Sequence, residues 1–266
     1  MKHVLSLGAG VQSSTIALMA AEGAVTPMPD GAIFADTGWE PQAVYVHLAW
    51  LKSVLPFPVH HVTAGNLREQ IGAERPFGKF LKVDIPAFVA VDGQRAGMLN
   101  RSCTRDFKID PIRKQLRAML ALTHRRSPKT PIVTQWIGIS VDEARRVRPS
   151  RDAWIANRYP LIEADMTRAD CLRWLASRWY PKPPKSSCIG CPFHSDDQWR
   201  ALTQEEMDDA ISVDRSLRDR PQARYRKKGQ LFLHRSCVPL ENVDFSAKDK
   251  PQLNLFALEC TGNCGT

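Results

Sequence analysis

The feature that most constrains the fold of this chain is a glycine-bearing turn between two apolar segments near its start. Residues 3–7 (His-Val-Leu-Ser-Leu) have the composition of a short buried strand, residues 8–12 (Gly-Ala-Gly-Val-Gln) follow at once, and residues 16–21 continue as an apolar helical run. Glycines in such a turn let backbone N–H groups converge in front of a helix N-terminus, whose dipole attracts anions. The turn predicts a strand–loop–helix unit that either binds a phosphate-like group or simply connects its two elements.

The alternation of strands and helices continues along the chain. Residues 31–35 have the pattern of a second buried strand, residues 44–55 place apolar side chains at helical spacing, and residues 59–62 have the pattern of a third strand. A fourth strand is expected within residues 131–139, and an arginine-rich loop leaves it. This rhythm indicates an α/β fold on a doubly wound parallel sheet of the Rossmann-like kind, whose ligands lie at the carboxyl ends of the strands.

The remaining segments suggest how the chain is divided. Residues 76–100 are irregular and glycine-rich, which indicates an insertion or a mobile flap over the site. A helix is predicted over residues 108–122, and another begins after Thr167, with Asp170 at the capping-box position. The expected domains are a nucleotide-binding domain over residues 1–193 and a helical or irregular C-terminal extension with a cysteine-bearing tail over residues 194–266.

Charge and composition limit the partners. The 266 residues include 37 Lys or Arg against 28 Asp or Glu, which gives a formal net charge of +9. This surplus suits anionic ligands, a phosphorylated nucleotide first and nucleic acid as a second option. No apolar run approaches the roughly 20 residues that span a bilayer, and the start of the chain lacks a signal-peptide pattern. We therefore expect a cytoplasmic protein without membrane contact.

Three of the seven cysteines stand in recognisable elements. Cys103 precedes the helix predicted over residues 108–122, and Cys188 and Cys191 form a Cys-x-x-Cys element followed by Pro192. Two thiolates three residues apart can hold one metal centre or act as a redox pair. In a reducing compartment, such cysteines more often bind metal or do chemistry than form structural disulfides.

Five motifs in order along the chain give it a resemblance to a known group. They are the loop at residues 8–14, Asp36-Thr37-Gly38-x-Glu40, Cys103-x4-Lys108-x2-Pro111-Ile112, Gly138-Ile139-x3-Glu143-x-Arg145, and Cys188-x2-Cys191-Pro192. From Ser6 to about Phe193, the chain resembles the PP-loop adenine-nucleotide enzymes and, within them, the phosphoadenylyl-sulfate (PAPS) reductase family. The resemblance implies a fold of the adenine nucleotide alpha hydrolase-like class.

The resemblance also implies a set of site residues. Lys108 and Arg145 would hold the anionic end of the nucleotide, and Cys260 in the tail would attack its sulfur. After Cys260 the tail departs from the family pattern, so a frayed terminus with incidental thiols at Cys260 and Cys264 is the alternative. The residues expected to contact the nucleotide are Ser6, Gly8, Gly10, Gln12, Ser13, Ser14, Asp36, Thr37, Gly38, Glu40, Gly138, Glu143 and Arg148.

One departure from the family concerns magnesium. PP-loop ATP pyrophosphatases have an aspartate at the position that Gln12 occupies here. A neutral amide cannot supply an anionic ligand for Mg²⁺. Gln12 therefore favours an adenylyl sulfate over ATP as the nucleotide, and Mg²⁺ is an optional cofactor.

The iron–sulfur members of the family imply the cofactor. Cys103, Cys188 and Cys191 match three ligands of a 4Fe-4S cluster, and Cys171 is the expected fourth. Cys237, Cys260 or Cys264 could serve in its place, or one iron could stay open. The alternative for Cys171 is a small buried residue on an apolar helix face. Zinc, which also accepts four thiolates, is the alternative metal and would act structurally.

Three functions remain open on the sequence. The first is a reductase-type oxidoreductase, in which a thiol or another electron donor acts on the sulfur of an adenylyl sulfate. The second is an ATP-dependent sulfurtransferase that thiolates DNA or tRNA. The third is a non-enzymatic nucleotide- or nucleic-acid-binding module with structural zinc.

Overall fold

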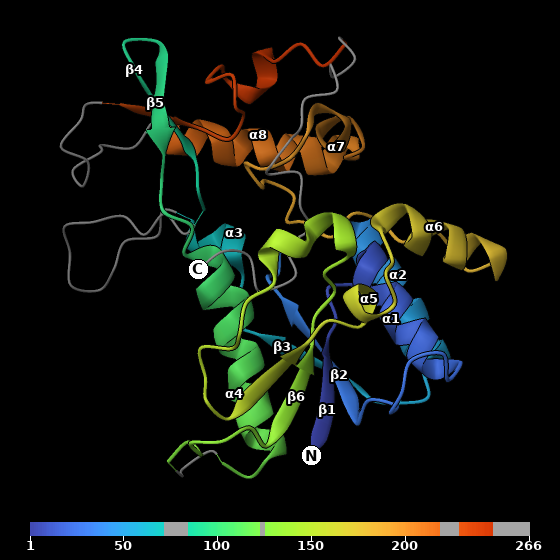
Figure 1. The fold of residues 1–266 in the computed structure, drawn as a ribbon. Helices are drawn as coiled ribbons and strands as arrows, with labels where there is room; N and C mark the ends of the chain where they lie inside the picture. Colours follow the sequence, from blue (N-terminus) through green and yellow to red (C-terminus); the bar gives the residue numbers. More distant parts are fainter. Residues whose placement is uncertain (72–84, 123–125, 219–228, 247–266) are drawn as a thin grey trace.

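The computed structural model describes residues 1–71, 85–122, 126–218 and 229–246 of the chain (Figure 1). Its centre is a sheet of five parallel strands in the order β3-β2-β1-β6-β7. This sheet confirms the α/β class predicted from the alternation of apolar segments. Its strands are β1 (Lys2–Ser6), β2 (Gly31–Asp36), β3 (Val59–Thr63), β6 (Val133–Trp136) and β7 (Ile155–Arg158).

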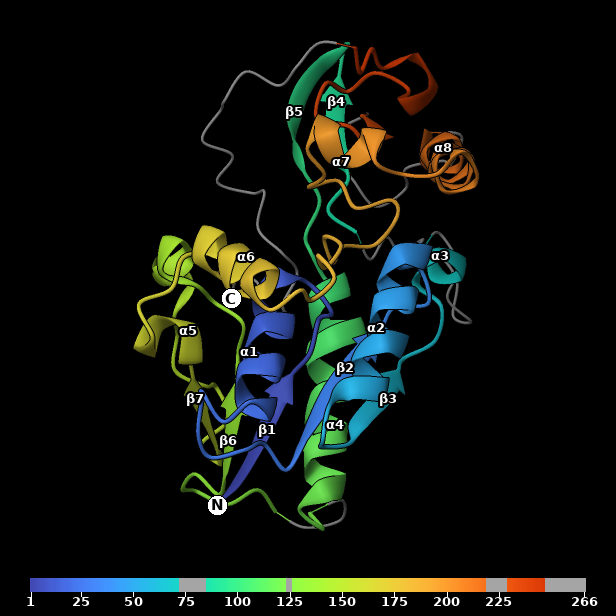
Figure 2. The same cartoon turned by 90° about the vertical axis from the view of Figure 1, so that its right-hand side faces the viewer.

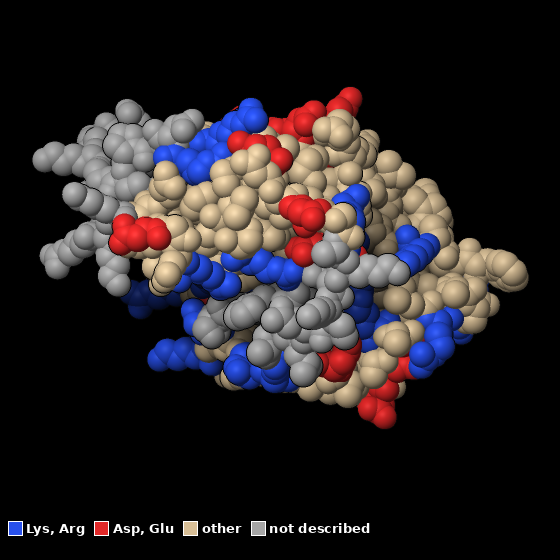
Figure 3. Space-filling model, turned by 90° about the horizontal axis from the view of Figure 1, so that it is seen from above, with Lys and Arg blue, Asp and Glu red and all other residues tan. Residues whose placement is uncertain are grey.

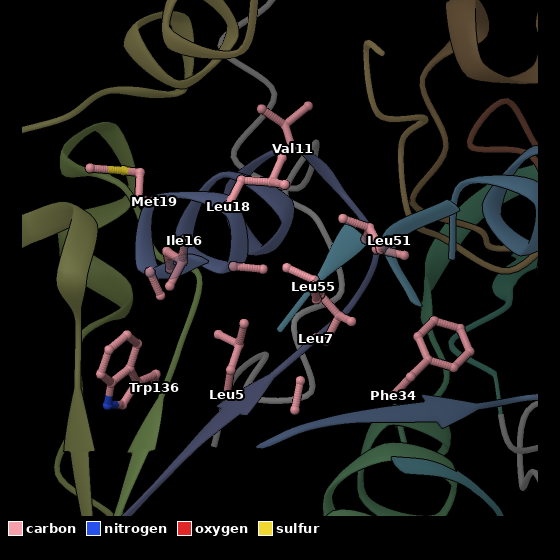
Figure 4. Close-up of a cluster of buried hydrophobic side chains, with 14 of the residues drawn as sticks. Leu5, Leu7, Val11, Ile16, Leu18, Met19, Phe34, Leu51, Leu55 and Trp136 are labelled. Carbon is pink, nitrogen blue, oxygen red and sulfur yellow. The ribbon is translucent and has the colours of Figure 1, made fainter. Parts of the chain in front are cut away.

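Helices cover both faces of this sheet, because neighbouring strand residues point to opposite sides. Leu5 and Phe34 enter the core under α1, α2, α5 and α6, whereas Val4 and Ile33 enter the core under α4. Figure 4 shows the first core, and Figure 1 shows α4 on one side of the sheet and α1 and α2 on the other. The helices are α1 (Val11–Ala21), α2 (Gln42–Val54), α4 (Asp110–Met119), α5 (Pro160–Glu163) and α6 (Arg168–Ser177).

The order of the strands creates a switch point at the carboxyl edge of the sheet. From β1 the chain proceeds outward through α1, β2 and α2 to β3, and after α4 it returns on the other side of β1 as β6. The connections after β1 and β6 therefore leave in opposite directions. In open α/β sheets, ligands bind in the crevice that such a reversal produces.

A second, smaller lobe lies above this edge (Figures 1 and 2). Its sheet has the order β5-β4-β8, with both pairs antiparallel. Inside the lobe the buried Asp214 carboxylate accepts the backbone N–H groups of Leu233 at 2.7 Å and Leu240 at 2.9 Å. The elements are β4 (Phe88–Val91), β5 (Gln94–Met98), α7 (Asp196–Arg200), α8 (Gln204–Arg218), β8 (Gln230–Phe232) and η3 (Leu240–Asn242), with the short α3 (Leu67–Gln70) after β3.

This lobe differs from the predicted division of the chain. The described part of the expected flap, residues 85–100, contains the β4–β5 hairpin, which pairs with β8 from the expected C-terminal extension. The lobe is therefore built from both sides of the boundary predicted at residue 193. The rest of the expected flap, residues 76–84, lies outside the described residues.

The other predicted elements are close to the observed ones. Thr167 and Asp170 form the predicted capping box at the start of α6. The helix predicted over residues 108–122 begins earlier, with a π-helical turn at Arg105–Ile109 (η1), and ends at Met119. A 3-10 helix, η2 (Val141–Arg146), follows β6. Among the described helices, none has the length and apolar character that crossing a membrane requires.

Candidate functional site

The start of α1 lies at the switch point, and residues 9–14 around it are buried. Gly10 is its N-cap, no described side chain caps it, and its first turn contains no acidic residue. Before it, Ala9 adopts a left-handed conformation with φ +54°, and the Gly8 N–H donates to Ser13 Oγ at 3.1 Å. Because the first N–H groups of a helix lack intrahelical acceptors, this end of α1 suits an anionic ligand.

The segment that follows β6 lies close against the start of α1. A Cβ added to Gly138 would lie 3.0 Å from the Ser13 backbone nitrogen, which is closer than ordinary van der Waals contact, so glycine suits this approach. Ser14, in contrast, points away from the crevice, since its Oγ lies 2.9 Å from His47 Nε2 on α2. Ser6 Oγ accepts from Gln135 Nε2 at 2.6 Å. The structure thus brings Gly138 and Ser13 together and gives Ser6 and Ser14 contacts within the fold.

Gln12 is the centre of a buried polar network. Its Nε2 lies 3.4 Å from both Ser140 Oγ and Glu143 Oε2, and its Oε1 accepts from Arg168 at 3.1 Å. Glu143 also pairs with Arg146 at 2.8 Å. Gln12 was expected to contact the nucleotide, but its amide joins the first turn of α1 to η2 and α6.

The arginines of the loop after β6 occupy different environments. Arg145 is exposed on η2. Arg148 folds back, with its guanidinium donating to the carbonyl oxygens of Arg145 at 2.9 Å and Val147 at 2.7 Å. Arg146, in contrast, is largely buried in its pair with Glu143. Arg145 and Arg148 are both exposed, and the exposure of both fits the predicted contact with a ligand.

Asp36, at the end of β2, organises a turn. Its Oδ1 accepts the Gly38 N–H at 2.7 Å and the Tyr45 hydroxyl at 2.9 Å, and its Oδ2 lies 2.8 Å from His61 Nε2. Burial, followed by the hydrogen bond to Asp36, raises the pKa of Tyr45. Gly38 has φ +68°, which favours glycine. Asp36 therefore holds the Gly38 backbone through Oδ1 and joins the end of β2 to His61 on β3 through Oδ2.

A buried ion pair lies beneath this turn. Lys108 Nζ is 3.2 Å from Glu40 Oε1, and the two side chains are 7% and 1% exposed. The Thr37 hydroxyl donates to the same oxygen at 3.1 Å. The π-helical turn η1 accommodates Lys108 and the preceding Phe107 with both side chains buried. Within the described part of the chain, Glu40 Oε2 is buried without a hydrogen-bond partner.

Cys188 adjoins this ion pair. Its Sγ lies 3.3 Å from Thr37 Oγ1 and 3.8 Å from Glu40 Oε1. Burial, and after it the Glu40 carboxylate, raises the pKa of the Cys188 thiol, while the Lys108 ammonium opposes the shift. The two predicted motifs that contain Glu40 and Cys188 thus meet at the carboxyl edge of the sheet.

The segments that carry Cys103 and Cys191 also lie close together. The Arg101 guanidinium is 5.0 Å from the centre of the Phe193 ring. Cys103 and Cys188 pack against the same apolar core, which includes Trp39 and Phe107. This arrangement agrees with the expected convergence of these sequence elements.

Cys171 lies elsewhere. It is fully buried in the core between α1 and α6, which is the alternative that the sequence left open. Among the residues that the structure describes, no three His, Cys, Asp or Glu side chains are placed to hold a metal ion. Cys171 lies in a different core from the one that Cys103 and Cys188 contact. The cluster stays an implication of the resemblance, and Cys260 and Cys264 lie outside the described residues.

Arg168, the first residue of α6, is a site residue that the sequence did not predict. Its contact with Gln12 depends on the packing of α6 against α1, and no local pattern reports such packing. The predicted capping box at Thr167 was the available signal, because it marks where the helix begins. Trp39 was missed as well: its indole N–H donates to Asp209 of α8 at 2.6 Å.

Seen from above, where the second lobe lies, the molecule shows several groups of Lys and Arg side chains with Asp and Glu side chains between them (Figure 3). The candidate site combines the start of α1, the polar network around Gln12, and a thiol beside a buried ion pair. In the comparisons with known proteins, no family model matches the chain and no curated protein matches it.

Proposed function

We propose that this protein is an enzyme of the PAPS-reductase kind, which binds an adenine nucleotide with an anionic tail at the crevice between β1 and β6. The observation that supports this best is the uncapped start of α1 at the switch point, surrounded by Gln12, Arg168 and Gly138. Helix N-termini and guanidinium groups are the two elements that proteins use most readily for phosphate and sulfate oxygens.

We expect the ends of β1 and β2 to hold different parts of the nucleotide. The anionic tail would lie at the start of α1, and the adenosine would extend toward the turn after β2, since β1 and β2 are neighbours in the sheet. Asp36 holds that turn, so the groups that approach the nucleoside are the backbone of Gly38 and its surroundings rather than the Asp36 carboxylate.

The proposed reaction is a two-electron reduction of sulfur by thiols. A thiolate, expected to be that of Cys260, attacks the sulfur of an adenylyl sulfate, so that an S–S bond forms and the S–O bond breaks with its electron pair leaving on the nucleoside phosphate. A second thiol, from a dithiol donor, then attacks the enzyme sulfur, which yields a disulfide and sulfite. Arg145 and Arg168 lie where they can offset the negative charge of the tail.

Binding is tested by calorimetry with adenosine 5′-phosphosulfate, ADP and adenosine. Gly10→Asp is the informative variant, because aspartate is a favoured N-cap and keeps the helix start while placing a carboxylate where the anion would lie. Gly10→Asn is the matched control, with the same size and no charge. We expect Gly10→Asp to lose ADP binding and Gly10→Asn to lose less. Equal affinity in both variants and the wild type would refute the location of the site.

Activity is tested by measuring sulfite and nucleoside phosphate released from adenosine 5′-phosphosulfate in the presence of a dithiol. We expect stoichiometric release, and its loss in Cys260→Ala. Release of pyrophosphate from ATP and Mg²⁺, with no sulfite from the adenylyl sulfate, would instead support the sulfurtransferase.

A further inference from the structure

The C-terminal end of α6 forms a Schellman motif, and its central residue is a tryptophan. The Trp179 N–H donates to the Ala176 carbonyl oxygen at 3.1 Å. The next N–H, of Tyr180, donates to the Leu175 carbonyl oxygen at 3.1 Å. Trp179 follows the C-cap residue of α6 and has φ +57°. Glycine is the usual residue at this position, because a side chain destabilises the left-handed conformation. Tryptophan is therefore an unfavourable residue for the backbone here.

The Trp179 side chain has little packing that would offset this cost. It is 95% exposed, more than any other large hydrophobic side chain in the described part of the chain. A single exposed apolar residue is common on protein surfaces. An exposed tryptophan in a left-handed conformation differs from that case, because both its backbone conformation and its contact with water are unfavourable. The packing of the described residues gives no reason for a tryptophan here, which indicates that Trp179 contacts another molecule.

The residues on either side of Trp179 are bonded to the rest of the fold. The Tyr180 ring stacks on the Trp174 ring, with centroids 6.1 Å apart and planes at 28°, and its hydroxyl donates to Glu22 at 2.9 Å. The Arg178 guanidinium lies 4.1 Å from the centre of the Trp174 ring and donates to the Glu22 carboxylate at 2.7 Å. Glu22 is the C-cap of α1, so both neighbours are tied to the end of that helix. Trp179 therefore extends from a fixed backbone, and its exposure leaves both faces of the ring accessible.

The aromatic surface of Trp174, Trp179 and Tyr180 is separate from the candidate site. The start of α6 contacts Gln12, whereas Trp179 follows the far end of the helix. The ten residues of α6 span about 15 Å. In Figure 1 this helix extends to the right-hand edge of the molecule. A ligand of the aromatic surface is therefore distinct from the nucleotide proposed for the crevice.

The charges near the aromatic surface indicate the kind of partner. Arg173, Arg178 and Lys182 are exposed and flank the aromatic residues in the sequence. Arg173 pairs with Asp170, and Arg178 pairs with Glu22. The whole chain has a formal net charge of +9, so a second copy is repelled whereas a polyanion is attracted. Single-stranded nucleic acid combines that negative charge with flat bases that stack on aromatic rings.

We propose that the end of α6 binds single-stranded nucleic acid, with a base stacked on Trp179 and the phosphate backbone beside Lys182. The bases of a duplex are stacked on one another, so an unpaired strand is the form whose bases can reach an isolated exposed ring. Stacking tolerates every base, because each has a π-face. The surface therefore accepts DNA or RNA strands with little sequence preference, and its affinity falls as the salt concentration rises. This binding is additional to the proposed nucleotide chemistry and does not depend on it.

The test measures the affinity for oligo(dT), oligo(U) and a DNA duplex by fluorescence anisotropy, and the melting temperature of each variant. Trp179→Gly removes the ring and introduces the residue that the Schellman motif favours. We expect it to bind both single strands about 5- to 100-fold more weakly than the wild type, which is the effect of losing one stacked base. We also expect it to melt about 2–4 °C higher, because the left-handed conformation no longer carries a side chain. The wild type should bind the duplex more weakly than either single strand.

Three further variants test the chemistry of the contact. Trp179→Tyr keeps an aromatic face and should retain most of the affinity for the single strands. Trp179→Leu keeps an apolar side chain without an aromatic face and should bind as weakly as Trp179→Gly. Lys182→Gln removes one cation, so the slope of log affinity against log salt should become shallower by about 0.7.

Several outcomes would overturn the inference while leaving the proposed function standing. They are the absence of oligonucleotide binding by the wild type, equal affinities of Trp179→Gly and the wild type, and full affinity in Trp179→Leu. A lower melting temperature of Trp179→Gly would show that the ring supports the fold, and would overturn it as well. Wild-type dimers in sedimentation that Trp179→Gly abolishes, without oligonucleotide binding, would instead assign the surface to a second copy of the chain. Binding of only one of the two single strands would support the inference and identify the partner as DNA or as RNA.

Discussion

At the scale of single residues, Glu40 and Lys108 form the buried ion pair of the candidate site. Both side chains are nearly inaccessible, so each charge depends on the other for compensation. We predict that Lys108→Met lowers the free energy of unfolding by about 3–5 kcal/mol, because it leaves the Glu40 carboxylate buried and uncompensated. Urea denaturation followed by circular dichroism measures the change.

The control for this prediction removes both charges. Glu40→Gln combined with Lys108→Met should recover much of the lost stability, because a buried amide costs less than a buried unpaired carboxylate. If the double variant is as unstable as the sum of the two single variants, the two charges are not coupled and the interpretation fails.

A second prediction at this scale concerns His47. Burial lowers its pKa to about 4 from the ordinary value of 6.5, and its Nε2 lies 2.9 Å from Ser14 Oγ. The unfolded chain therefore binds a proton between pH 6.5 and about pH 4 that the folded protein excludes. The contribution of His47 is complete above pH 6.5 and is lost as the pH falls toward 4, by roughly 3 kcal/mol.

The measurement compares the wild type with His47→Gln, whose amide can still bond to Ser14. The free energy of unfolding of the wild type should fall more steeply between pH 6.5 and pH 4.5 than that of the variant. Parallel curves would show that His47 does not contribute to the slope.

The sequence predicted which residues gather at the site better than it predicted what each one does. Glu40, Lys108 and Cys188 were identified by their motifs, and they do meet. Asp36 and Gln12 were expected to face a ligand, but the fold bonds their polar atoms to residues distant in the chain, such as His61 and Arg168. A motif reports chemical type, whereas the direction of a side chain depends on tertiary neighbours.

At the scale of elements, the segment after α6 must pass very close to the turn that follows β2. A Cβ added to Gly190 would fall 2.1 Å from Trp39 Cη2, and the Ile189 N–H donates to the Trp39 carbonyl oxygen at 2.8 Å. We predict that Gly190→Ala destabilises the protein by about 1–3 kcal/mol, the usual cost of overpacking. Thermal melting measures this loss.

A smaller ring at position 39 should relieve the contact that Gly190→Ala makes with Trp39. In a Trp39→Phe background the smaller ring leaves room for the methyl group, so Gly190→Ala should cost less there than in the wild type. The same cost in both backgrounds would mean that the glycine is required for another reason.

The elements also show where prediction from sequence ends. The strands and helices of the main sheet follow from local apolar spacing, and most were predicted within a few residues. The β4–β5 hairpin was not predicted, although Asp92-Gly93 is a strong signal for a two-residue hairpin turn and both residues have positive φ. Its strand β4 pairs with β8 and joins Ala90 to Gln230, and no sequence pattern near either residue predicts a partner so distant in the chain.

At the scale of the whole molecule, the second lobe is bonded to the turns at the carboxyl edge of the main sheet. Asp209 on α8 accepts from Trp39 at 2.6 Å and from Arg68 at 2.6 Å, and Glu206 accepts the Gln42 N–H at 2.8 Å. These bonds hold the segments that follow β2 and β3. The candidate site therefore lies between two lobes, both of which shape it.

This arrangement predicts the outcome of truncation. A chain ending at residue 193 should not unfold cooperatively, because β4 would lose its partner β8 and Trp39 its contact with Asp209. A chain ending at residue 246 keeps every described element of the lobe and should unfold like the full-length protein. Calorimetric melting of the three chains decides the matter, and a cooperative transition in the shortest one would contradict the prediction.

The hydrogen bond between Trp39 and Asp209 has a wider consequence. It ties the turn after β2 to α8, so a ligand bound at the proposed site and the position of that helix should be thermodynamically linked. A molecule that binds the outer side of α8 and moves it should change the affinity for the proposed nucleotide. By reciprocity, that nucleotide should change the affinity for the molecule by the same factor.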